Sequence, residues 1–189
     1  MSNKQKWLIG IGVVAGLCVC AAAVAILVLR EAASRVTDSF KTDPTSIAEV
    51  GHGIAEYDVP PGYQESMAMS FFTYDMIAMA PTSDPESGSM IMMMQFAGAA
   101  AASPEEMQRA MEQQTGRPGS QMTIVESRTE IIRGEEVAVT ISESKTEGFK
   151  LRQLVAVFRG NRGPTMLMIQ GPSEGWDKAM IETFIKSIR

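Results

Sequence analysis

RQLVAVFRGNRGPTMLMIQGPSEGWDKAMIETFIKSIR, residues 152–189, holds the two patterns that decide the fold class. Two apolar runs flank the turn residues GNRG, which is typical of a β-hairpin. Apolar residues then recur at helical spacing and form one face, made of Trp176, Met180, Ile181, Phe184, Ile185 and Ile188. We therefore predict a strand hairpin followed by an amphipathic C-terminal helix that packs on a sheet.

The same kinds of pattern occur upstream of this run. Residues 70–81 and 89–97 predict two strands joined by turn residues, and residues 121–133 and 135–145 predict a second pair that turns at Gly134. The order of strands and helices along the chain predicts an α+β fold, in which helices cover an antiparallel β-sheet.

Two helices are expected before the C-terminal one. Ser103, Pro104 and Glu106 form a capping box with proline at the first helical position, which marks a helix start, and Gly116 marks its end. A shorter amphipathic helix is expected where Ile47, Val50 and Ile54 recur at helical spacing.

A long apolar segment precedes the domain. WLIGIGVVAGLCVCAAAVAILVL, residues 7–29, contains no charged residue, and a helix at about 1.5 Å per residue would cross a hydrocarbon core of roughly 30 Å. Cleavage near its middle would leave a new start that is still strongly apolar, so we predict an uncleaved transmembrane helix. The predicted order is a short tail (1–6), this helix, a juxtamembrane linker (30–45) and the α+β domain (46–189).

The short tail favours a single-pass signal anchor that places the domain outside the cytoplasm, in the periplasm or at the cell surface. Gly12, Gly16 and Cys20 form a stripe of small residues along the segment, which would allow a homodimer or contact with a membrane-protein partner. Glycine and alanine are also common in membrane helices without such a role. Cys18 and Cys20 are the two cysteines of the chain, so the domain has neither a disulfide nor a cysteine metal cluster.

The run GSMIMMMQF, residues 88–96, is the sharpest local feature of a chain with 15 methionines. Alternation along a strand places Met90, Met92 and Met94 on one face and Met93 on the other. Core packing is the favoured interpretation, because methionine fills irregular gaps well. An exposed, adaptable groove and a Cu(I) site at Met90, Met92 and Met94 stay open as alternatives, since thioether sulfur is a soft ligand.

Catalytic signals are weak. His52 is the one histidine of the chain, and no nucleophile elbow, phosphate-binding loop, dinucleotide fingerprint or calcium loop accompanies it. A hydrolase that uses His52 is the third choice, and we expect no enzyme activity and no cofactor. Basic residues are enriched around residues 150–162, but the net charge of −5 argues against a nucleic-acid partner.

DVPPGY (58–63), SPEEMQRAMEQQ (103–114) and the closing run resemble the PsbP-like superfamily, which includes the extrinsic photosystem II protein and Ran-binding Mog-type proteins. The resemblance covers about residues 47–189. It implies an α/β/α sandwich that acts as a binding or assembly module without catalysis, here as a membrane-anchored, bacterial-type member. It implies no site residues, and the ligand stays unknown.

Overall fold

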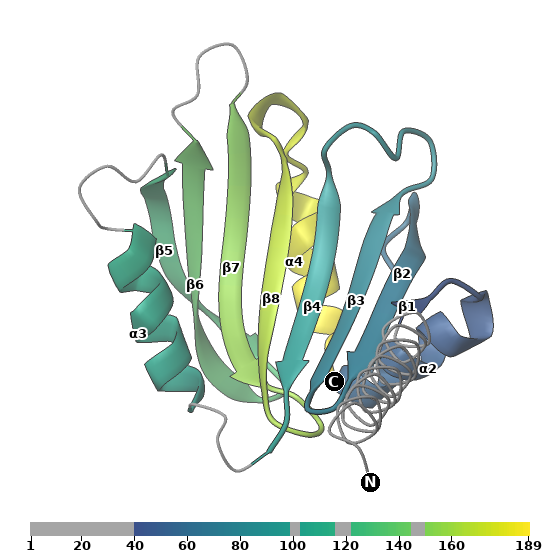
Figure 1. The fold of residues 1–189 in the computed structure, drawn as a ribbon. Coiled ribbons are helices and arrows are strands. Elements are labelled where there is room, and N and C mark those ends of the chain that lie inside the picture. The colour runs from purple at the N-terminus through teal and green to yellow at the C-terminus, as the bar shows by residue number, and fades with distance from the viewer. Residues whose placement is uncertain (1–39, 99–102, 116–121, 145–149) are drawn as a thin grey trace, which may run out of the picture. The chain divides into compact units, whose positions relative to one another are not determined.

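The computed structural model describes residues 40–98, 103–115, 122–144 and 150–189, and Phe40–Arg189 forms one compact unit (Figure 1). Its centre is an eight-stranded antiparallel sheet with the order β1-β2-β3-β4-β8-β7-β6-β5. The strands are β1 Phe40–Lys41, β2 Tyr63–Phe71, β3 Tyr74–Pro81, β4 Met90–Phe96, β5 Met122–Ile132, β6 Glu135–Ser144, β7 Leu151–Arg159 and β8 Pro164–Pro172. The helices are α2 Pro44–Ile54, α3 Pro104–Thr115 and α4 Lys178–Ser187, with a short 3-10 turn at Ser173–Gly175.

The fold is richer in β-structure than the α+β sandwich that the sequence predicts. A single sheet dominates, and the three helices of the described ranges are short, with 11, 12 and 10 residues. Part of the difference lies at residues 70–81, for which the sequence predicts one strand. The chain instead reverses at Phe72 and Thr73, so that β2 ends at Phe71 and β3 begins at Tyr74. Phe72 adopts a φ of 49°, which is rare for a bulky residue, and no glycine, proline or asparagine marks this turn.

The prediction of a single-pass membrane protein is not supported. Within the described ranges, no helix combines the length and apolar character that crossing a membrane requires. The expected span at 7–29 lies outside the described residues, and so do Gly12, Gly16 and Cys20.

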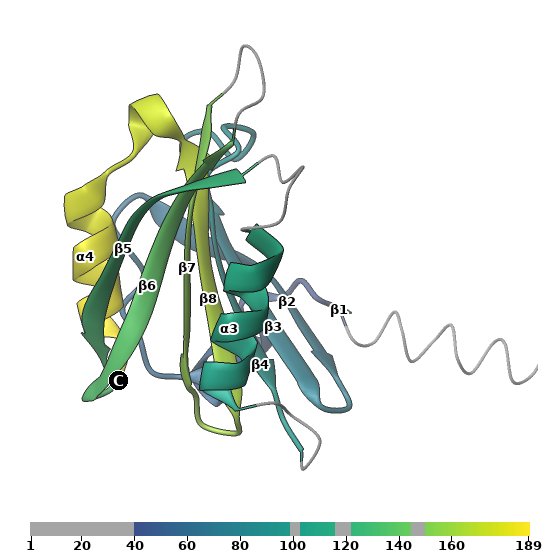
Figure 2. The ribbon, with the colours of Figure 1, turned by 90° about the vertical axis from the view of Figure 1, so that its left-hand side faces the viewer.

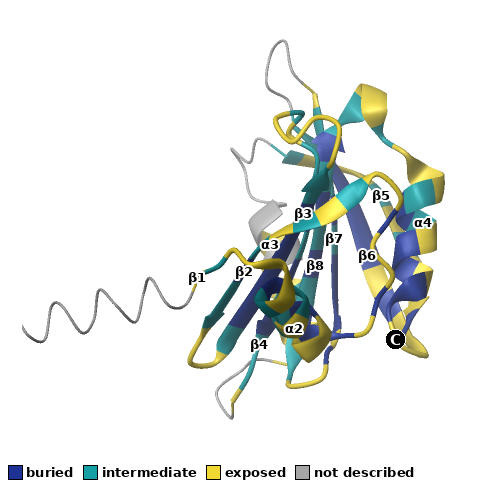
Figure 3. Cartoon of the chain, turned by 90° about the vertical axis from the view of Figure 1, so that its right-hand side faces the viewer, coloured by how far each residue is buried: buried dark blue, intermediate teal, exposed yellow. Residues whose placement is uncertain are grey.

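One face of the sheet carries the hydrophobic core. Its strand positions include Ala68, Ile77, Met79, Ile91, Met93, Val139, Ile141, Leu154, Ala156, Phe158, Leu167 and Ile169, all buried. Helices α2 and α4 bury their apolar residues in the same core (Figure 3). Both helices begin at an aspartate cap: Asp43 accepts from Ser46 N, and Asp177 accepts from Met180 N, each at 2.9 Å. The predicted amphipathic C-terminal helix is therefore confirmed.

Helix α3 lies on the opposite face of the sheet from α4 (Figure 2). It packs against β7 and β5. The predicted capping box is present, because Glu106 N donates to Ser103 Oγ at 3.2 Å and Ser103 N donates to Glu106 Oε2 at 2.9 Å. The helix begins at Pro104, as expected, and Gly116 lies outside the described residues.

Candidate functional site

The face of the sheet that α2 and α4 do not cover carries a cluster of methionines. We call it the methionine face, and its members are Met67, Met69, Met76, Met90, Met92, Met94, Met166 and Met168. They come from β2, β3, β4 and β8, which are neighbours in the sheet. Figure 1 looks onto this side, with α4 behind the sheet.

Strand register places seven of these eight methionines in two rows, and Met90 lies opposite Gln170 on β8 instead. In the first row, Met94 on β4 lies opposite Met76 on β3 and Met166 on β8, and Met76 lies opposite Met69 on β2. Directly opposite residues on antiparallel strands have Cβ atoms about 4.5 to 5.5 Å apart. Their long side chains are therefore immediate neighbours.

The second row is centred on Met92. It lies opposite Met168 on β8 and Ala78 on β3, and Ala78 lies opposite Met67 on β2. Gln153 on β7 donates from Nε2 to the sulfur of Met168 at 2.6 Å. The two rows follow one another along the strands, since side chains two residues apart share a face.

Burial separates the methionines of β4 as alternation predicts, and it places one of them in the core. Met93 has no exposed surface and belongs to the core cluster. Met90, Met92 and Met94 are only half-buried and lie outside that cluster. The alternation therefore follows the prediction. The three methionines that the Cu(I) alternative named lie outside the core cluster, on a part of the sheet that no helix of the described residues covers.

The methionine face is uncharged. On β2, β3, β4 and β8, the positions that point to it hold no Asp, Glu, Lys or Arg. Aromatic residues form one end, where the rings of Tyr74 and Phe96 pack with centroids 5.4 Å apart. Burial raises the pKa of the Tyr74 hydroxyl above its usual value, so this end of the face is partly desolvated. An open, apolar surface of this kind is typical of an interaction site.

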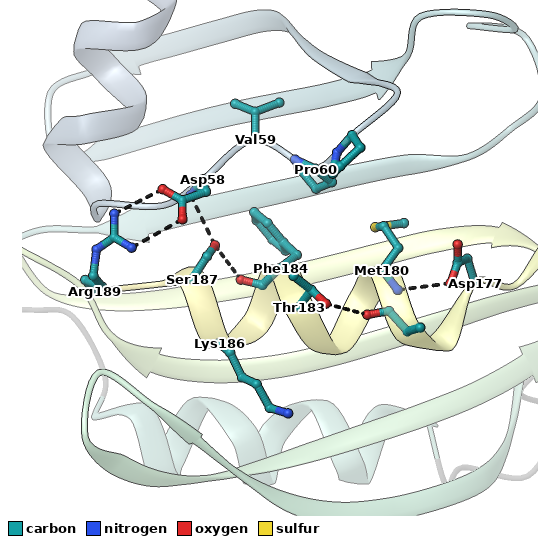
Figure 4. A pocket seen from close by; sticks show the side chains of 12 residues that line it. Asp58, Val59, Pro60, Asp177, Met180, Thr183, Phe184, Lys186, Ser187 and Arg189 are labelled. Atoms are coloured by element: carbon teal, nitrogen blue, oxygen red, sulfur yellow. Dashed lines mark hydrogen bonds and ion pairs between the residues drawn. The ribbon is translucent and has the colours of Figure 1, made fainter.

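A second candidate is a pocket of about 560 Å³ between α4 and the loop 58–61 (Figure 4). Its lining includes Val59, Pro60, Met180 and Phe184. Sequence reasoning missed it, because its two walls are far apart in the chain. They meet where the backbone N–H of Asp58 donates to Ser187 Oγ at 3.1 Å.

An ion pair lies at one end of this pocket. Arg189 Nη2 is 3.0 Å from Asp58 Oδ1, and both side chains are largely exposed. The hydrogen bond from the guanidinium holds the pKa of the Asp58 carboxyl below its usual value. The pair fixes the C-terminus against the loop, together with backbone hydrogen bonds between Arg189 and Glu56.

His52 lies on the surface at the end of α2. Its Nδ1 is 3.0 Å from Glu56 Oε2, with about half of each side chain exposed, and its ring stacks on Tyr57 at 5.8 Å. Among the interactions described for this chain, none joins the His52 ring to a serine or threonine hydroxyl. The arrangement is a surface contact between an imidazole and a carboxylate, and the hydrolase alternative gains no nucleophile from it.

The basic residues around 150–162 do not form one patch. Arg152 pairs with Glu143 and lies over the ring of Trp176 at 5.8 Å, near the start of β7. Arg162 lies beyond the other end of this nine-residue strand, where it pairs with Asp75 at 2.8 Å. The enrichment seen in the sequence is therefore divided between two ends of the sheet.

The described residues contain no group of three or more His, Cys, Asp or Glu side chains that could hold a metal ion. Thioether sulfur is thus the one clustered soft donor found in this part of the chain. No family model matches the sequence, and no curated protein matches it. The resemblance to the PsbP-like superfamily therefore stays a prediction.

Proposed function

We propose that this protein is a non-catalytic binding module whose methionine face receives an apolar helix of a partner protein. The observation that carries the proposal is the unequal cover of the two sheet faces. The core face is covered by α2 and α4, whereas α3 covers only the β5 to β7 part of the other face. The part formed by β2, β3, β4 and β8 has no helix of the described residues over it.

The dimensions of this open part suit one helix. Four adjacent strands at about 4.8 Å spacing span roughly 14 Å, and a helix with its side chains is about 10 to 12 Å wide. Helix α3 already lies against the neighbouring strands of the same face. A partner helix beside it would complete the second layer of the domain.

The chemistry of the face also favours a helix with an apolar surface. Methionine is unbranched and flexible, so a group of methionines adjusts to differently shaped apolar side chains, as promiscuous helix-binding surfaces do. The positions of the four strands that point to the methionine face hold no charged side chain, so a docked helix would bury no ionic group of these strands without a partner. Affinity then comes from apolar area, which makes recognition tolerant of sequence.

Fluorescence anisotropy tests the proposal with the full-length protein and a labelled synthetic amphipathic peptide, which has leucine on one face and alternating lysine and glutamate on the other. We expect saturable binding that Met92→Glu weakens at least tenfold, about 1.4 kcal/mol, because the helix would bury a carboxylate. Val59→Glu is the matched control, since Val59 is 41% exposed and lies at the pocket beside α4.

Two results would contradict the proposal. One is the absence of saturable binding by the unmodified protein. The other is equal weakening by Met92→Glu and Val59→Glu, which would move the site away from the methionine face. Circular dichroism of both variants verifies that each one is folded.

A further inference from the structure

We propose that Met76, Met94 and Met166 form a Cu(I) site on the methionine face. The three residues lie directly opposite one another on β3, β4 and β8, with Met94 in the middle. The site uses the same open face as the proposed function and rests on that face being accessible, but it does not need a partner helix.

The register brings the three sulfur atoms within reach of one ion. Neighbouring members of the row have Cβ atoms about 4.5 to 5.5 Å apart, and methionine has three rotatable side-chain bonds. Rotation of the side chains therefore allows the three thioethers to converge above the strand of Met94. Met69 continues the row on β2 and offers a fourth sulfur.

Accessibility favours this row as well. Met94 and Met166 are half-buried, so an ion reaches them from the side of the sheet that no helix of the described residues covers. Met76 is only 8% exposed, so it would bind the ion from within the row. The second row is less suited, because the sulfur of Met168 already accepts a hydrogen bond from Gln153. Met92 has Ala78 on its other side, so that row has no third sulfur beside it.

The donor set selects the metal. Thioethers are soft, neutral ligands that favour Cu(I) over Zn²⁺, Mg²⁺ and Ca²⁺, which prefer thiolate, imidazole or oxygen ligands. The four strands contribute no charged side chain to this face, so they offer no carboxylate that would attract a hard cation. Tyr74 and Phe96 stand beside the row, and their rings shield one side of it from water.

The test is anaerobic titration of the full-length protein with Cu(I) against a chromophoric Cu(I) chelator. Cys18 and Cys20 are replaced by serine in every sample, because their thiols would take up Cu(I) on their own. We expect one Cu(I) per chain, no comparable binding of Zn²⁺, and an affinity at least about tenfold lower for Met94→Leu, since the loss of a ligand costs at least as much as the loss of an outer-shell partner. Met79→Leu is the matched control, because Met79 is fully buried on the core face.

The substitution to leucine separates this inference from the proposed function. Leucine keeps the apolar volume but removes the sulfur, so Met94→Leu should still bind the helical peptide while losing Cu(I) affinity. The absence of Cu(I) binding by the protein, or equal affinity of Met94→Leu and Met79→Leu, would overturn the site. The absence of peptide binding by the unmodified protein would instead contradict helix docking and would not affect the Cu(I) result.

Discussion

Two adjacent methionines of β4 provide a direct comparison between the faces of the sheet. Met93 is fully buried in the core, and Met92 is half-buried on the methionine face. The two residues are adjacent in the chain, and both lie in the middle part of the strand. The two alanine substitutions therefore differ chiefly in how completely the rest of the protein covers the deleted side-chain atoms.

The magnitudes follow from the atoms removed. Truncation of methionine to alanine deletes three heavy atoms, worth about 2.4 kcal/mol at roughly 0.8 kcal/mol each when they are fully buried. At Met93 an enclosed cavity adds to this loss, so Met93→Ala should lower the free energy of unfolding by about 2 to 5 kcal/mol. At Met92 part of the side chain already contacts water and no enclosed cavity forms, so the expected loss is about 1 kcal/mol.

Urea unfolding of the full-length protein and the two variants, followed by circular dichroism, measures both losses under the same conditions. The stability of Met93→Ala should fall below that of Met92→Ala by about 2 kcal/mol. Equal losses near 3 kcal/mol would refute the reasoning, because Met92 would then be covered as completely as Met93.

Further predictions concern the helices and the ion pair at the pocket. Gly53→Ala should stabilise the protein by about 1 kcal/mol, since nothing lies within 4 Å of the new Cβ on α2. Gly51→Ala should destabilise the protein, because its Cβ would lie 2.0 and 2.6 Å from side-chain atoms of the core. Thermal unfolding should therefore give a higher midpoint for Gly53→Ala and a lower one for Gly51→Ala. Asp177→Ala should lower the free energy of unfolding by about 1 kcal/mol, because α4 loses its cap. Asp177→Asn keeps the capping oxygen and should keep most of this stability. Equal urea midpoints for the two variants would argue against the cap. The pKa of Asp58 is lower in the folded protein than its unfolded value near 3.8, so the contribution of this carboxylate to stability is present above pH 3.8 and is lost as the pH falls through the folded pKa. Asp58→Asn should therefore lose less stability than the unmodified protein between pH 5 and pH 2. Parallel profiles of stability against pH would show that Arg189 does not act on this carboxyl.

Hairpins with clear turn residues could be predicted from the sequence. Gly134 joins β5 and β6, where its φ of 79° suits glycine, and the GNRG turn joins β7 and β8. The β2 to β3 hairpin could not be predicted, because Phe72 and Thr73 are poor turn formers whose conformation depends on the surrounding sheet. Because the sequence does not predict this hairpin, the predicted fold has one strand too few and is too rich in helix.

The candidate sites show the same division between local and distant information. Alternation within one strand predicted that Met92 and Met94 share a face and that Met93 lies opposite. Whether a helix covers each face depends on the placement of α3 and α4, which no local pattern encodes. The pocket beside α4 was also hidden from the sequence, since Asp58 and Ser187 meet across 129 positions.

Oxidation by dilute hydrogen peroxide tests most directly whether the methionine face is open. Mass spectrometry of peptides from the folded protein, with fragmentation to separate neighbouring residues, gives the rate of sulfoxide formation at each methionine. Met92, Met94 and Met168 should be oxidised at least about tenfold faster than Met79 and Met93, which have no exposed surface. Equal protection of all five residues would contradict an open methionine face.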